Sequence, residues 1–169
     1  MGVTKVKKKI GLNSLLVVGM FAAFASAGTA LAQDCANPIP IHTDEQDVTG
    51  DTCTAGNPLP SYGGTGSSQN EIVYSFTAQG ANANISITGT GGYAGTTPAI
   101  FLFPACSAST DPIAFGIPGV PMAVTGLTDG QQYFIAVTAD PGGPADGCGA
   151  YDVDVDGTLP VVVQNFVVE

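Results

Sequence analysis

Hydrophobic and polar residues alternate along much of the chain, with the period of two that is typical of β-strands with one buried face. The clearest alternation covers 71–78, where Ile72, Tyr74 and Phe76 share one face. A second run, 83–89, alternates isoleucine with serine and threonine. We expect a strand in each run, with the apolar side chains turned toward a core.

Further runs with strand character follow. The run 98–103 is almost continuously apolar, which predicts a central strand buried on both faces. Strands are also expected at 120–125 and 131–139, and the Asp-Gly pair in the segment 126–130 between them predicts a hairpin. Valine and aspartate alternate in 151–156, which predicts one apolar and one carboxylate face.

Weaker strand signals occur at 39–43 and 46–49, and nothing after residue 32 is typical of a helix. Loops rich in Gly, Pro and Ser occupy roughly 54–70 and 139–147, and their small polar residues are not expected to build a core. Eight or nine short strands at this spacing predict an all-β protein, an antiparallel, jelly-roll-like β-sandwich.

The N-terminus has the pattern of a secretory signal peptide. All four basic residues of the chain lie among its first nine positions, and an apolar run, 15–27, follows them. Ala30 and Ala32 supply the small residues that a signal peptidase requires before Gln33. We therefore expect a signal peptide at 1–32, a sandwich at 33–157, and a linker and C-terminal strand at 158–169, in a secreted, extracellular protein.

Cleavage would leave a chain without Lys or Arg that carries all 14 acidic residues. Phosphate backbones and anionic lipids would repel such a surface, so nucleic acid and, after cleavage, membrane are not expected as partners. Salt bridges to Lys or Arg cannot form, and no trypsin site remains. Stability must then come from the core, disulfides, hydrogen bonds and, where present, a metal ion.

Four cysteines follow the expected cleavage site, and an even number in an exported protein predicts disulfides. Three pairings are possible. We expect Cys35 with Cys53 and Cys106 with Cys148, because each pair would tether a flexible segment close to strands. A zinc site is the alternative, although the sequence has no CxxC pair.

Several segments resemble the bacterial pre-peptidase C-terminal domain family. The segments 34–37 and 48–52 resemble its opening landmarks, and 70–77 (NEIVYSFT) resembles its D-x-W-Y-S-F-T strand. The segment 99–104 is similar to its central strand, and 126–137 (GLTDGQQYFIAV) to its L-x-x-G-x-x-Y-x-I-x-V hairpin.

The resemblance spans about 34–157 and implies a jelly-roll-like sandwich. Such domains are usually appendages of secreted proteases and other extracellular enzymes, sometimes associated with calcium or polymer binding. Glu71 and Val73 stand where the family has Asp and Trp, which is a departure from its pattern. We expect no attached enzyme, so we do not transfer the accessory role to this protein.

The sequence offers little for catalysis. His42 is the only histidine, and no nucleophile motif such as G-x-S-x-G accompanies it. We therefore expect a protein that is not an enzyme and interpret His42 as a solvated or half-buried strand residue.

Calcium is the one cofactor that the pattern suggests. Asp152, Asp154 and Asp156 would project from one strand face, and Asp140 and Asp146 lie in the nearby Gly-Pro loop. Calcium takes several hard oxygen ligands, which such a cluster would supply. The alternative is an acidic stripe that faces solvent. A separate sequon, Asn84-Ile85-Ser86, predicts a glycosylation site at Asn84.

The last nine residues are apolar on both faces of an extended strand. Val161, Val163 and Val167 would lie on one face, with Phe166 and Val168 on the other. Such a strand needs cover on two sides. It either closes its own sandwich or leaves through the linker and completes the sheet of another copy.

Repeated head-to-tail donation would build a fibre. Our first hypothesis is therefore a secreted structural, pilin-like subunit of an extracellular filament, with other copies of itself as partners. The alternative is a monomeric calcium- or carbohydrate-binding module at the cell surface. A type IV-like pilin is a third hypothesis, but the glutamate expected early in the stalk of such a pilin is missing.

Overall fold

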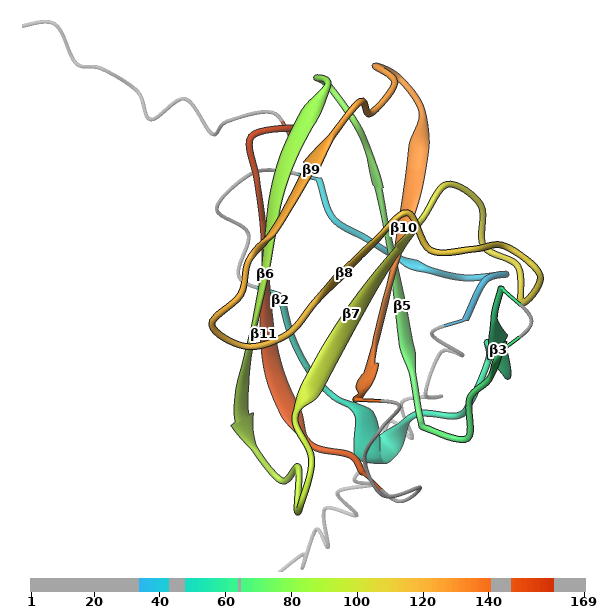
Figure 1. Cartoon of the computed structure of the whole chain (residues 1–169), viewed down its shortest axis with the longest axis vertical. Coiled ribbons are helices and arrows are strands. Elements are labelled where there is room, and N and C mark those ends of the chain that lie inside the picture. The colour runs from blue at the N-terminus through green and yellow to red at the C-terminus, as the bar shows by residue number, and fades with distance from the viewer. Residues whose placement is uncertain (1–33, 43–47, 64, 141–146, 160–169) are drawn as a thin grey trace, which may run out of the picture.

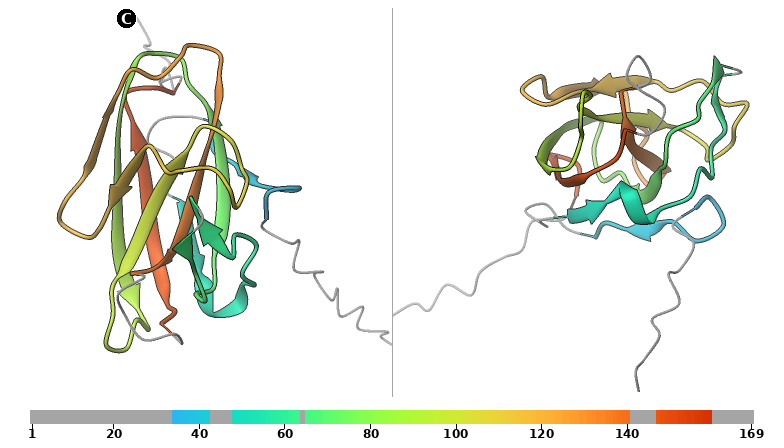
Figure 2. Two further views of the ribbon diagram at one scale, coloured as in Figure 1. Left: turned by 45° about the vertical axis from the view of Figure 1, so that its right-hand side comes forward. Right: turned by 90° about the horizontal axis from the view of Figure 1, so that it is seen from below.

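The structure, a computed structural model, describes residues 34–42, 48–63, 65–140 and 147–159. The predicted signal peptide and the C-terminal segment 161–169 lie outside the described residues. The described part is an all-β sandwich, as the alternating pattern predicted, and its long strands run along the long axis of the molecule (Figure 1; Figure 2, left).

Two sheets form the sandwich, and neighbouring strands in each order are hydrogen-bonded. The five-stranded sheet has the order β1-β5-β10-β7-β8. Its strands are β1 (Ile39–Pro40), β5 (Ile72–Thr77), β10 (Gln132–Ala139), β7 (Pro98–Phe103) and β8 (Ala114–Gly116). The four-stranded sheet has the order β2-β11-β6-β9. Its strands are β2 (Val48–Asp51), β11 (Ala150–Asp156), β6 (Asn82–Gly91) and β9 (Met122–Thr125).

The core lies between the two sheets and contains the side chains that the alternation placed inward. Ile72, Tyr74 and Phe76 enter it from β5, and Ile85 and Ile87 enter it from β6. All six residues of β7 are buried, so the prediction of a central strand covered on both faces is confirmed. Leu159, the last described residue, also belongs to this core.

Pairing is antiparallel except between β1 and β5, which run parallel. The predicted hairpin of 120–125 with 131–139 is wrong. β9 pairs with β6 in one sheet, whereas β10 pairs with β5 and β7 in the other. The segment 126–130 therefore crosses between sheets, and the Tyr133 hydroxyl accepts a 2.9 Å hydrogen bond from the Thr128 N–H in it. A local turn signal cannot distinguish a hairpin from such a crossover.

The expectation that 54–70 cannot build a core is also wrong. The short 3-10 helix η1 (Thr52–Thr54) ends where this segment begins, and the segment itself contains the small hairpin of β3 (Ser61–Tyr62) with β4 (Thr65–Gly66). Leu59 and Tyr62 form a second apolar cluster with Val73, Phe101 and Phe103 on the outer face of the five-stranded sheet. Two large side chains were enough to make this segment cover the sheet.

The predicted disulfide pairing is wrong as well. Cys35 bonds to Cys106, and Cys53 bonds to Cys148. The first bond lies beside the outer cluster, and the second ties η1 to the segment that precedes β11. Both bonds join segments that are distant in sequence. The prediction considered only which flexible segments lie close to strands along the chain, and this does not identify such distant partners.

Candidate functional site

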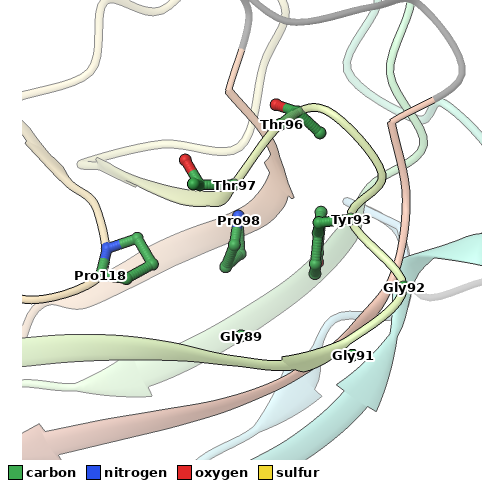
Figure 3. A pocket seen from close by; sticks show the side chains of 8 residues that line it. All are labelled: Gly89, Gly91, Gly92, Tyr93, Thr96, Thr97, Pro98 and Pro118. Atoms are coloured by element: carbon green, nitrogen blue, oxygen red, sulfur yellow. The ribbon is translucent and has the colours of Figure 1, made fainter.

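A groove of about 300 Å³ lies at one end of the sandwich, where the β6–β7 turn meets the β8–β9 turn. Figure 3 shows Tyr93, Pro98 and Pro118 in a row across it, with Thr96 and Thr97 to one side and Gly89 and Gly91 to the other. Because glycine has no side chain, the backbone N–H and C=O groups on that side of the groove are not covered. The arrangement combines flat apolar rings with the hydroxyl of the exposed Thr97, whereas Oγ1 of Thr96 is buried.

Tyr93 is half-buried, and its position is defined by polar contacts. The Tyr93 hydroxyl lies 3.3 Å from Oγ1 of Thr52, whose side chain is fully buried. Burial raises the pKa of the Tyr93 hydroxyl, while the Thr52 contact acts in the opposite direction. The phenol therefore stays neutral at physiological pH and can act as both donor and acceptor.

No charged side chain is among the described residues that line the groove. The remainder of the chain after residue 9 carries 14 carboxylates and neither Lys nor Arg, so an anionic ligand would be repelled. The groove is therefore suited to a neutral ligand that presents both C–H groups and hydroxyls.

Two buried tyrosines form a separate pair of hydroxyl groups between the sheets. The Tyr74 and Tyr151 hydroxyls, from β5 and β11, lie 2.8 Å apart and join the two sheets. Burial raises the pKa of each, and both side chains are at most 1% exposed. Gly50 is required beside them, because a Cβ there would lie 2.3 Å from the Tyr151 hydroxyl oxygen.

A buried carboxyl group lies apart from the groove, beneath the segment 54–70. Glu71 is 1% exposed; it accepts a hydrogen bond from the Tyr62 hydroxyl and a 2.9 Å bond from the Leu59 N–H. Burial raises the pKa of Glu71 to about 7, against the lowering effect of these bonds. The place of Glu71 in the family-like motif did not indicate that its carboxyl group would be buried and hydrogen-bonded.

The acidic stripe takes the alternation that the sequence predicted, with Tyr151, Val153 and Val155 buried and Asp152 exposed. Its neighbours across the sheet are polar residues of β6. Within the described residues, no three His, Cys, Asp or Glu side chains are grouped so as to hold a metal ion. Asp152, Asp154, Asp156 and Asp140 are described, and Asp146 lies outside the described residues. Calcium binding stays a prediction.

Two other predicted residues are placed by the structure. Asn84 is exposed on β6, and its glycosylation stays a prediction. His42 is exposed next to the end of β1, outside the groove. The predicted polymerisation residues Val161, Val163, Phe166, Val167 and Val168 lie outside the described residues.

Sequence reasoning missed Tyr93. The signal that could have revealed it is an aromatic residue within a Gly- and Thr-rich turn, 89–97, where a large apolar ring is not needed for turn formation. Thr52 and Gly149, its neighbours in the structure, lie far from it in sequence, and no local pattern connects them.

The described residues include no helix that is long and apolar enough to span a membrane. No family model and no curated protein matches the chain. Solved structures do match it. The chain is similar to the pre-peptidase C-terminal domain of a collagenase from Bacillus anthracis, with 18% identity over 70% of this chain and 93% of that chain, at a TM-score of 0.45.

It is also similar to the mitogen derived from Yersinia pseudotuberculosis, with 11% identity over 72% of this chain and 90% of that chain, at a TM-score of 0.45. One of these two solved structures is thus a pre-peptidase C-terminal domain, the family that the sequence motifs resemble. At these identities the likeness concerns the fold alone, and the function has to be argued from this chain's own residues.

Proposed function

We propose that this protein is an extracellular, non-enzymatic module that binds neutral saccharide chains in the Tyr93 groove. The observation that carries the proposal is an uncharged groove in which an anchored tyrosine ring lies in a row with two proline rings, beside the exposed Thr97 (Figure 3). The C–H face of a pyranose packs against aromatic and proline rings. Its hydroxyls pair with the hydroxyl of the exposed Thr97 and with backbone groups that are accessible beside the exposed glycines.

The charge of the chain supports the choice of ligand class. A neutral glycan carries no charge to be repelled by the 14 carboxylates, whereas acidic polysaccharides and nucleic acids do. Two disulfides among the described residues are what an oxidising, extracellular compartment favours.

Tyr93→Ala should weaken saccharide binding at least tenfold, about 1.4 kcal/mol, because it removes the ring on which the sugar packs. The measurement is a titration of ¹⁵N-labelled protein with neutral hexasaccharides of glucose, xylose and N-acetylglucosamine. The amide signals of Gly91, Gly92 and Thr97 should shift with at least one of them.

Phe115→Ala is the matched control, because Phe115 is a half-exposed aromatic on β8 that does not line the groove. This variant should bind as the unmodified protein does. The proposal is wrong if none of the sugars shifts these signals, or if both variants lose affinity equally.

A second candidate function, the filament subunit, is favoured by a different observation. In the part of the chain that the structure describes, the two sheets have continuous strand orders and share a core that already includes Leu159. The described residues before the two-faced apolar segment 161–169 thus already form two continuous sheets around a shared core. We propose that this segment adds to an exposed sheet edge of another copy.

Deleting 161–169 should abolish assembly and leave the melting temperature of the sandwich unchanged, because in this proposal the segment packs on another copy and not in its own domain. Size-exclusion chromatography and negative-stain microscopy of the purified protein measure assembly, and thermal unfolding measures the sandwich. If the full chain is monomeric and the deletion lowers its melting temperature, the segment closes its own domain and the filament proposal fails.

A further inference from the structure

Thr52 and Gly149 form a reciprocal pair of contacts directly behind Tyr93. The Thr52 N–H donates to the Gly149 carbonyl at 3.0 Å, and the Gly149 N–H donates to Thr52 Oγ1 at 3.0 Å. The same Oγ1 lies 3.3 Å from the Tyr93 hydroxyl. One buried hydroxyl therefore connects the two backbone segments to the ring of the groove.

The Tyr93 ring also packs directly on the backbone of Gly149. A Cβ at Gly149 would lie 2.5 Å from Tyr93 Cδ2 and 2.7 Å from the Tyr93 nitrogen, which no side chain could occupy. A Cβ at Gly92 would lie 2.7 Å from the Gly149 Cα. Gly92 also has a φ of +95°, a conformation that favours glycine. The position of Gly149 thus decides the position of the ring.

The Cys53–Cys148 disulfide is adjacent in sequence to both members of this pair. It joins the residue after Thr52 to the residue before Gly149 across a sequence separation of 95. Cys53 is exposed, so a dithiol reductant can reach the bond. The other disulfide, Cys35–Cys106, lies beside the outer cluster of the five-stranded sheet and has no contact in the groove.

We propose that the Cys53–Cys148 disulfide, acting through Thr52 and Gly149, is the positioning device of the groove, so that its reduction releases the Tyr93 ring and switches ligand binding off. The inference rests on the proposed saccharide function for its binding readout. In the reduction, a dithiol transfers two electrons to the disulfide. The protein gains two thiols, and the dithiol closes to its own disulfide.

The experiment follows the Tyr93 ring and the ligand separately. Protein labelled with ¹³C-tyrosine is reduced stepwise with dithiothreitol, and the ring signals of Tyr93 are compared with those of Tyr133, which is remote from this disulfide. Reduction of Cys53–Cys148 should alter the Tyr93 signals first and weaken binding of the saccharide probe at least tenfold. Cys53→Ala with Cys148→Ala should reproduce both effects, and Cys35→Ala with Cys106→Ala should produce neither.

Because a variant without a disulfide can fail to fold, Thr52→Val tests the same connection with both bonds intact. It removes the hydroxyl that joins Gly149 to Tyr93, so it should alter the Tyr93 ring signals and weaken binding of the saccharide probe. Thr52→Ser should restore the ring signals and the binding. An unchanged Tyr93 ring in folded protein that has lost Cys53–Cys148 overturns the inference. If the ring responds but no sugar binds even the oxidised protein, the saccharide function fails and the positioning role stands.

Discussion

Replacing both Cys35 and Cys106 by Ala should lower the free energy of unfolding by about 4 kcal/mol, the entropy that a cross-link over 71 residues removes from the unfolded chain. This bond also lies against the outer cluster, against which Cys35 and Cys106 both pack, so its removal disturbs the packing there as well. Urea unfolding of the variant and of the oxidised protein, compared at equal slope, measures it.

The connectivity is tested on the same protein. Because the chain has no trypsin site after Lys9, non-reducing peptide maps require pepsin. They should contain Cys35 linked to Cys106 and Cys53 linked to Cys148. A map with Cys35 linked to Cys53, or a loss of stability below about 1 kcal/mol, would contradict this assignment.

The stability of the protein should fall as the pH rises from about 4.5 to about 7, and Glu71 should be the main cause. The folded-state pKa of Glu71 is raised above its unfolded value, so the folded protein retains a proton that the unfolded chain has lost in this window. The free energy of unfolding then decreases with pH, by about 3 kcal/mol for a shift of this size. Above pH 7 a buried carboxylate remains, and the chain has no Lys or Arg after residue 9 to pair with it.

Glu71→Gln separates this effect from the relief of general repulsion between carboxylates. Glutamine keeps the acceptor for the Leu59 N–H and a polar group toward Tyr62, but it carries no charge. Urea titrations at pH 5 and pH 8 should show a variant that equals the unmodified protein at pH 5 and exceeds it by about 3 kcal/mol at pH 8. Asp152→Asn, which removes an exposed carboxylate, is the control and should retain the pH dependence. If Glu71→Gln has the same slope with pH as the unmodified protein, another group is responsible.

The ionisation of Glu71 is also expected to affect the segment 54–70. Leu59 and Tyr62 both hydrogen-bond Glu71 and both cover the outer face of the five-stranded sheet. Ionisation of Glu71 places a charge under this cover, and burial together with that charge raises the pKa of Tyr62. The loss of stability as the pH rises toward 7 is therefore expected to affect this segment before the core between the sheets.

Most strands were predictable from sequence because each has a local cause. The period of two in Ile72, Tyr74 and Phe76 needs only a pleated strand with one buried side, and the apolar run of β7 needs only a position inside a sheet. The sandwich class follows from many such runs separated by turn residues. β8 was missed, because a three-residue strand between prolines has too few positions for a period to emerge.

The candidate site could not be predicted in the same way. Thr52, Tyr93 and Gly149 come together only because β2, β6 and β11 are neighbours in one sheet and a disulfide joins the segments at one end. The raised pKa of Glu71 likewise depends on a cover formed by Leu59 and Tyr62, which lie in a segment whose composition is typical of a loop.

The sequence by itself determined the all-β class, the faces of the long strands and the strongly acidic, lysine-free character of the chain after residue 9. Periodicity is a pattern among neighbouring residues, and charge follows from composition. Both can therefore be determined from the sequence alone. Only the tertiary structure decided which cysteines bond, that β9 and β10 belong to different sheets, and that Tyr93 lines a neutral groove. These features arise from contacts between residues far apart in the chain, where the packing of whole sheets rather than local preference selects the partner.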